Sequence, residues 1–154
     1  MNNELKIAKI ILIGCGPHAR RVYLPAINKI KHVKLELIVD LESQESLLRS
    51  SLTNFQETKL HIIRPFENNV PDELSNFLSK YVQEKGISGV IIATEPLVHK
   101  AYANWAIQNG LNILMDKPIT ARANAVSDNT SAEGILDDFL QILENYKMCI
   151  RDSG

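Results

Sequence analysis

Residues 13–27, "IGCGPHARRVYLPAI", decide the fold of this chain. They follow the apolar run 7–13, which has the length and composition of a buried strand, and they open a stretch with helical spacing. Gly14, Gly16 and Ala19 therefore match G-x-G-x-x-A at a strand-to-helix turn. In that context the first glycine permits a tight turn, the second lets backbone approach a pyrophosphate, and the small third residue lets the helix pack on the strand. The stretch predicts a turn that binds the phosphates of a dinucleotide at a helix N-terminus.

The alternation of strand and helix continues along the chain. Five apolar runs of strand length are each followed by apolar residues at helical spacing. The predicted strands are 7–13, 34–40, 59–66, 88–94 and 111–118, and the predicted helices are 18–30, 42–55, 71–85, 97–110 and 132–146. Residues 121–132, which are polar and small, predict a loop. This pattern implies a parallel sheet covered on both faces, so we expect a doubly wound, Rossmann-like α/β fold.

Helical spacing also predicts which side of three helices is buried. Each of these helices carries apolar residues three or four positions apart, as one face of a helix requires. The expected buried residues are Val22, Ala26 and Ile30 in the first helix, Leu74, Phe77, Leu78 and Tyr81 in the third, and Ala101 and Trp105 in the fourth. Gly86 is expected to end the third helix.

The composition narrows the classes of function. The chain has 17 Lys and Arg against 18 Asp and Glu, a net charge of −1, so we expect no binding of nucleic acid or of an anionic membrane. No apolar run has the length of a membrane span, and the first residues lack a secretory signal, so we expect a cytoplasmic protein. Cys15 and Cys149 make neither a disulfide framework nor a set of zinc ligands, and we expect no metal site.

Asp40 supplies the acid that a dinucleotide site needs. It ends the second predicted strand about 20 residues after the glycine motif, the spacing at which a carboxylate reaches the ribose hydroxyl of NAD. Leu41 and Glu42 follow in place of an arginine, so a 2′-phosphate would meet carboxylates and NAD is favoured over NADP. A glycine turn with a helix-capping aspartate is the alternative reading of the same residues.

Lys117 is the strongest catalytic candidate. Pro118 disfavours helix at the preceding residue, so Lys117 is expected to be extended at the carboxyl end of a strand, the edge where open parallel sheets bind ligands. Its ammonium could there hydrogen-bond a hydroxyl that is being oxidised and stabilise developing alkoxide charge. A surface lysine before a turn proline is the alternative.

Residues 13–27 and residues 91–120, "IIATEPLVHKAYANWAIQNGLNILMDKPIT", resemble the nucleotide-binding half of the Gfo/Idh/MocA oxidoreductases. The resemblance covers nearly all of residues 7–120, and its most specific element is "DKP" after the fifth strand. It implies that Lys117 is the catalytic-site lysine with Pro118 as its neighbour. It also implies that the residues from Thr94 through Glu95 to Pro96 lie on a loop that approaches the nicotinamide. Asp116 stands where the family usually has Glu, and its role at the catalytic site stays open.

Three further residues are candidates for contact with the cofactor. His18 lies near the expected phosphate position. Cys15, between the two glycines, has no base partner in the motif, so packing or cofactor contact is favoured over a nucleophilic role. His99 could reach substrate or cofactor from the first turn of the fourth helix, and a capping or solvated histidine is the alternative.

The family resemblance implies a longer parent protein. In the family, an α/β domain with an open antiparallel sheet follows, holds the substrate and makes homo-oligomers. We therefore expect residues 1–146 to be the dinucleotide-binding domain of an NAD(P)-dependent oxidoreductase that acts on a hydroxyl of a sugar, cyclitol or similar polar metabolite, and to be inactive alone. Two alternatives stay open: a non-catalytic regulator that senses dinucleotide, and a Rossmann-like domain for another nucleotide such as S-adenosylmethionine.

The last residues form a separate unit in this interpretation. The string "KMCIRDS" at residues 147–153 matches the translation of a transposon mosaic-end adapter used in DNA library preparation. We therefore expect residues 147–154 to be an artefact tail, which makes Cys15 the one native cysteine.

Overall fold

The computed structural model describes residues 6–152. In them, five parallel strands form one sheet in the order β3-β2-β1-β4-β5. The strands are β1 (Ala8–Ile13), β2 (Val33–Leu41), β3 (Lys59–Ile63), β4 (Gly89–Ile92) and β5 (Asn112–Met115). The predicted doubly wound, Rossmann-like fold is confirmed.

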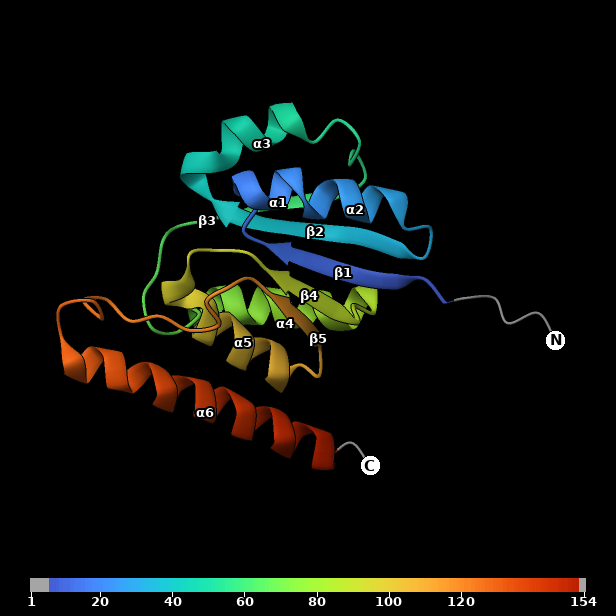
Figure 1. Ribbon diagram of the computed structural model, residues 1–154. Helices are drawn as coiled ribbons and strands as arrows, with labels where there is room; N and C mark the ends of the chain where they lie inside the picture. The colour runs from blue at the N-terminus through green and yellow to red at the C-terminus, as the bar shows by residue number, and fades with distance from the viewer. Residues whose placement is uncertain (1–5, 153–154) are drawn as a thin grey trace.

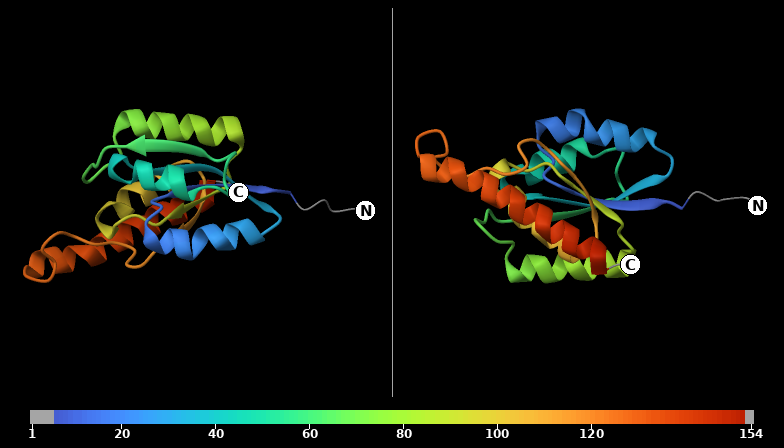
Figure 2. Two further views of the ribbon diagram at one scale, coloured as in Figure 1. Left: turned by 90° about the horizontal axis from the view of Figure 1, so that it is seen from above. Right: turned by 60° about the horizontal axis from the view of Figure 1, so that its bottom comes forward.

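Helices cover both faces of the sheet (Figure 1). The α-helices are α1 (Pro17–Arg21), α2 (Tyr23–Lys29), α3 (Glu45–Ser51), α4 (Asp72–Lys85), α5 (His99–Gln108) and α6 (Asn129–Asp152), and the short 3-10 helices are η1 (Glu42–Gln44) and η2 (Pro96–Val98). One apolar core joins the sheet to α1, α2 and α3, and a second joins it to α4 and α5, with Ile142 of α6 packed against the second. The views of Figure 2 show the long α6 running across the outside of this second layer.

The strand order places a topological switch point between β1 and β4. The chain moves outward from β1 through β2 to β3 and then returns to add β4 on the other side of β1. Open α/β sheets bind ligands in the crevice at the carboxyl ends of such a strand pair. The backbone there continues the ladder, with Ala93 N–H donating to Ile13 O at 2.8 Å and Gly14 N–H to Val39 O at 2.8 Å. The fold therefore places the glycine motif at the edge of the sheet where a ligand is expected.

The predicted helix 18–30 is wrong as a single element. The structure has α1 and α2 with a break at Val22, because Pro25 has no N–H and its ring would clash with the carbonyl of Arg21 in a continuous helix. The break rotates the second half, so the expected face turns outward: Val22 is 46% and Ile30 is 50% exposed. The buried residues are instead Ala19, Leu24 and Ile27.

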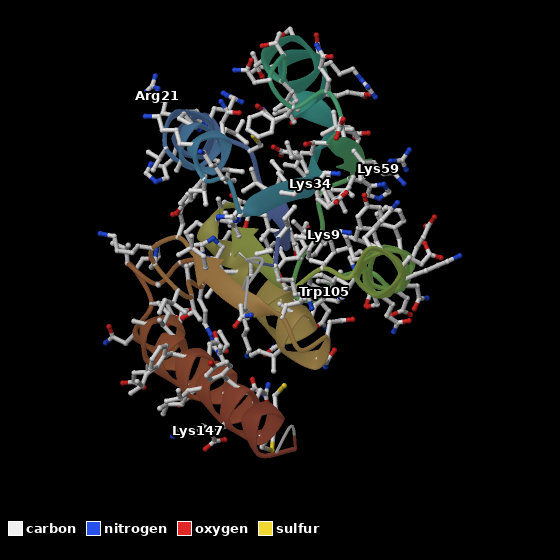
Figure 3. The ribbon with its side chains drawn as sticks, turned by 90° about the vertical axis from the view of Figure 1, so that its right-hand side faces the viewer. Lys9, Arg21, Lys34, Lys59, Trp105 and Lys147 are labelled. Atoms are coloured by element: carbon white, nitrogen blue, oxygen red, sulfur yellow. The ribbon has the colours of Figure 1, made fainter. Side chains whose placement is uncertain are left out.

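The other helical faces are confirmed. In α4, Leu74, Leu78 and Tyr81 of the expected stripe are buried, whereas Phe77 is only half-buried and packs against the core from its edge. Gly86 ends the helix in the left-handed conformation with φ +65°. In α5, Ala101 and Trp105 are buried. The Trp105 indole, labelled in Figure 3, donates from Nε1 to Ser79 Oγ of α4 at 3.1 Å, so it packs α5 on α4 as a core residue.

Several boundaries differ from those expected. The predicted helix 42–55 is reduced to η1 and α3, and the third and fifth strands end earlier, at Ile63 and Met115. The last helix begins within the predicted loop 121–132, because the Asp128 carboxylate caps it by accepting from Ser131 N–H at 2.9 Å. It also continues through residues 147–152, whose origin stays a prediction. Within residues 6–152, no helix combines the length and apolar character of a membrane span.

Candidate functional site

The glycine turn, residues 14–19, is fixed by a close approach between backbones. Gly14 has φ +83°, and a Cβ added there would lie 2.6 Å from Ala93 O at the end of β4. A real Cβ essentially never comes this close to another backbone, and the positive φ adds strain for any other residue, so this position requires glycine. Gly16 differs, because a Cβ added there meets nothing within 4 Å. The turn thus packs tightly on β4 through its first glycine and opens to free space at its second, which is the space that a pyrophosphate would need.

Asp40 holds the glycine turn from the neighbouring strand. This buried carboxylate accepts from Cys15 N–H through Oδ2 at 2.7 Å and from Leu41 N–H through Oδ1 at 2.7 Å. A carboxylate oxygen has two acceptor positions, so each oxygen can accept one further hydrogen bond. Asp40 can therefore fix the turn and accept from a ribose hydroxyl at the same time.

Cys15 is packed rather than reactive. Its side chain is buried, and burial together with the nearby Asp40 carboxylate raises the pKa of the thiol to about 11. A thiol with so high a pKa is a poor nucleophile near neutral pH. The carbonyl of Cys15 accepts from Arg20 Nη1 at 3.0 Å, which closes the turn from the α1 side.

At the other end of the site, Asp116 binds a residue that the sequence did not point to. Tyr23 of α2 donates its hydroxyl hydrogen to Asp116 Oδ1. Burial and this hydrogen bond raise the pKa of Tyr23 to about 12. His18 stands beside the pair, with Nε2 3.9 Å from Asp116 Oδ1 and its ring edge-on to that of Tyr23. Asp116 thus joins the end of β5 to α1 and α2.

The lysine loop, residues 116–122, is tethered at alternate residues. Asp116 is bound by Tyr23 of α2, and the carbonyl of Pro118 lies 2.9 Å from Nδ1 of His99 in α5. Thr120 Oγ1 donates to Ile135 O of α6 at 3.2 Å, and Arg122 Nε donates to Asp138 Oδ2 of α6 at 2.7 Å. Lys117 lies between the first two tethers with its side chain exposed, and the peptide bond from Lys117 to Pro118 is cis. In residues 6–152, Lys117 takes part in no ion pair, so its ammonium is available to a ligand.

Asp138 anchors the far end of this loop. Its carboxylate, 6% exposed, pairs with Arg122 and with Lys100 Nζ, the latter at 2.5 Å. The hydrogen bonds from Arg122, followed by those from Lys100, lower the pKa of Asp138 to about 2. One carboxylate therefore joins α5, α6 and the lysine loop.

The predicted site residues at the carboxyl ends of the strands form a row along one edge of the sheet. The strands lie side by side in the order β2-β1-β4-β5. The residues at their carboxyl ends therefore follow one another along this edge of the sheet as Asp40, the glycine turn, Thr94 and Asp116. Strands are about 4.8 Å apart, so the row spans roughly 14 Å. Glu95, in the loop after Thr94, lines a cleft of about 700 Å³ together with Phe66, Lys100 and Arg122.

Sequence reasoning missed Tyr23 and Asp138 as parts of this site. Tyr23 lies 93 residues before its partner Asp116, and the broken helix that turns it toward β5 was not expected. Asp138 lies within the predicted helix 132–146, and no local signal in the sequence points to its two cationic partners. The alternative of a solvated His99 is also wrong, since this side chain is 0% exposed.

Comparison with known proteins agrees with the geometry. The model of the family described as "Oxidoreductase family, NAD-binding Rossmann fold" (GFO_IDH_MocA) matches residues 8–134. A search of curated proteins found no match.

Solved structures share the fold at low sequence identity. A dehydrogenase from Chromobacterium violaceum has a TM-score of 0.65 and 15% identity, over 94% of this chain and 34% of its own. An oxidoreductase from Agrobacterium radiobacter, in complex with NAD+, L-tartaric acid and magnesium, has a TM-score of 0.62 and 18% identity, over 92% and 33%. A 3-ketoreductase from Actinomadura kijaniata, in complex with NADP and TDP-benzene, has a TM-score of 0.58 and 14% identity, over 94% and 35%.

The chain therefore spans about a third of the length of the solved structures it matches. Its own match to the family model extends from β1 into α6 and includes both the glycine turn and the lysine loop. On that match, the chain belongs to the Gfo/Idh/MocA family of oxidoreductases and carries the family's NAD-binding Rossmann domain.

Proposed function

We propose that this chain is the cofactor-binding part of an NAD-dependent oxidoreductase that transfers a hydride between nicotinamide and a hydroxyl of a sugar, cyclitol or similar polar metabolite. The observation that carries the proposal is the row of Asp40, glycine turn, Thr94 and Lys117 along the carboxyl edge of the sheet. An extended dinucleotide needs a ribose acceptor at one end, open backbone in the middle and a reactive group at the other, and the row supplies them in that order.

The residues present fit a dinucleotide. Asp40 would accept from a ribose hydroxyl, and the open space above Gly16 would take the pyrophosphate, with Cys15, His18 and Ala19 around it. The segment from Thr94 to Pro96, together with Lys117 and Pro118, would border the nicotinamide. NAD is favoured over NADP, because Asp40 and Glu42 would repel a 2′-phosphate.

Lys117 is the proposed catalytic residue. Bound NAD would supply the acceptor for the hydride that leaves the substrate carbon. The Lys117 ammonium would donate to the substrate oxygen and stabilise the developing alkoxide, while the hydroxyl proton passes to a base that the second domain of the parent protein would supply. Asp116, held by Tyr23, would fix the start of the lysine loop and so the direction of Lys117.

The remaining catalytic groups are proposed to lie in a second, substrate-binding domain of the parent protein. The matched structures are about three times as long as this chain, so each has room for a second domain beyond the part that matches. The 154-residue chain should then bind dinucleotide without turning over substrate. Steady NAD reduction by the purified chain with any polyol would contradict this part of the proposal. Homo-oligomerisation through the second domain is part of the same proposal.

Calorimetric titration of Gly16→Val tests the cofactor site. A Cβ added at Gly16 has no protein atom within 4 Å, so the variant should fold with a loss of about 1 kcal/mol at the helix cap. The same side chain would fill the space of the pyrophosphate and should abolish NAD binding. Ala26→Val, which introduces the same side chain on the exposed side of α2, is the matched control and should bind like the original chain.

Titrations of the original chain with NADP and S-adenosylmethionine complete the test. We expect NAD to bind more tightly than either ligand. Failure of NAD to bind, or equal binding by Gly16→Val and Ala26→Val, would remove the proposed function.

A further inference from the structure

His99 joins the two loops that border the proposed nicotinamide position. It is the first residue of α5 and is 0% exposed. Its Nδ1 lies 2.9 Å from Pro118 O in the lysine loop, and its Nε2 lies 3.0 Å from Thr94 O in the loop after β4. One ring therefore spans the ends of two neighbouring strands.

Both partners of the ring are carbonyl oxygens, which can only accept hydrogen bonds. A neutral imidazole donates through one nitrogen, whereas a ring with hydrogen on both nitrogens donates to both carbonyls. Because the side chain is buried, water cannot replace either bond, and a lost bond leaves a buried polar group without a partner. The contacts also occupy both nitrogens, which leaves His99 no polar atom for a cofactor.

We propose that His99 is a positioning residue that holds the lysine loop against the loop after β4 and thereby sets the direction of Lys117. The bonded carbonyl belongs to Pro118, directly after Lys117, so a shift of that carbonyl moves the lysine backbone with it. The other bonded carbonyl, of Thr94, belongs to the loop proposed to face the nicotinamide. This inference rests on the proposed function for the role of Lys117, while the link between the loops is a property of the chain itself.

Three substitutions separate the two bonds. The side-chain nitrogen of His99→Asn lies where Nδ1 was and keeps a donor for Pro118 O, and that of His99→Gln lies where Nε2 was and keeps a donor for Thr94 O. His99→Leu keeps neither. His61→Leu is the matched control, because it makes the same substitution at a partly buried histidine that stacks on Phe77 of α4, away from both loops.

Amide hydrogen exchange, read residue by residue by NMR on the full 154-residue chain, gives the first measurement. We expect His99→Leu to speed exchange about tenfold at Ala93 and Asp116, whose N–H groups donate to Ile13 O and Ile92 O at the start of the two loops, relative to the amides of α4. We expect His99→Asn to restore protection at Asp116, and His99→Gln to restore it at Ala93. A general loss of stability would speed exchange in α4 equally, which distinguishes positioning from a merely structural role.

Two outcomes would overturn the proposal: unchanged exchange in both loops of a folded His99→Leu chain, or the same pattern in the Asn and Gln variants. If His99→Leu does not fold, the opposite patterns of amide exchange expected for His99→Asn and His99→Gln still test the proposal. Titration with NAD is the second measurement, and we expect His99→Leu to bind about tenfold more weakly than His61→Leu. Failure of the original chain to bind NAD would remove the proposed function, whereas hydrogen exchange without NAD would still test the link between the loops.

Discussion

The glycine turn and the lysine loop lie at the same edge of the sheet but are held in different ways. The turn is fixed through its backbone: Gly14 packs against the backbone of Ala93, and the backbone N–H of Cys15 donates to the carboxylate of Asp40 on the adjacent strand. The loop is held by side chains from α2, α5 and α6. A turn defined by sterics tolerates almost no change, whereas a loop held by several separate bonds loses them one at a time. The proposed cofactor-binding end of the site is therefore held rigidly by steric contact, and the proposed catalytic end is held only while its tethers remain.

Gly14→Ala is the change expected to cost most. The new Cβ would lie 2.6 Å from Ala93 O, and the residue would keep φ +83°, so we expect a loss of roughly 4 kcal/mol in the free energy of unfolding. Gly86→Ala is the control, because Gly86 also has a positive φ, +65°, but an added Cβ meets nothing within 4 Å. It should cost about 1 kcal/mol. Urea unfolding measures both, and equal costs would mean that the turn is not sterically fixed.

Asp138→Asn tests the strongest tether of the lysine loop. Removing the charge leaves Lys100 and Arg122 without their partner, and because both cations are partly exposed we expect a loss of about 2 kcal/mol at pH 7. The pKa of Asp138 is lowered from 3.8 to about 2 in the folded chain. Its contribution to stability is therefore complete above pH 4 and disappears as the pH falls toward 2.

Urea unfolding of Asp138→Asn and of the original chain between pH 7 and pH 2 measures this contribution. The difference between them should shrink across the window from pH 4 to pH 2. Glu45→Gln, which removes an exposed ion pair with Arg49 inside α3, should cost only about 0.3 kcal/mol. A difference for Asp138→Asn that does not depend on pH would show that the ion pairs do not carry the tether.

The same contrast explains what the sequence could predict. The glycine motif, Asp40 and the strand-helix alternation are local patterns, so the fold and the glycine end of the row could be anticipated from spacing, whereas Thr94 and Asp116 entered only through the family resemblance. The break at Val22 was missed because apolar periodicity hid the effect of Pro25 one turn later. Tyr23 and Asp138 were missed because their partners become neighbours only after the sheet and α6 are assembled.

Asp40→Asn should cost less than Asp138→Asn. Both carboxylate oxygens of Asp40 accept from backbone N–H groups, and an amide can accept through one of its atoms only. The N–H of Cys15 or of Leu41 then loses its partner, at a cost of about 1.5 kcal/mol. Asp40→Glu keeps both acceptors but moves them outward, so it distinguishes loss of charge from loss of geometry. If Asp40→Asn unfolds in urea like the original chain, the glycine turn is held by the Gly14 contact alone.

Of the four substitutions tested at the site, Tyr23→Phe is expected to cost the least stability. It bears most directly on the proposed catalytic end. The change removes one hydrogen bond, to Asp116, and should cost about 1 kcal/mol. The folded pKa of Tyr23 is raised to about 12 from 10, so the contribution of this bond is complete below pH 10 and is lost as the pH rises toward 12. A double-mutant cycle with Asp116→Ala isolates the interaction, which should couple the two residues by about 1 kcal/mol at pH 7.

The cofactor affinity of Tyr23→Phe should stay close to that of the original chain, because the glycine turn is held without Tyr23. A loss of NAD binding as large as that of Gly16→Val would instead mean that the two ends of the site are one mechanical unit, and the contrast between turn and loop would not hold.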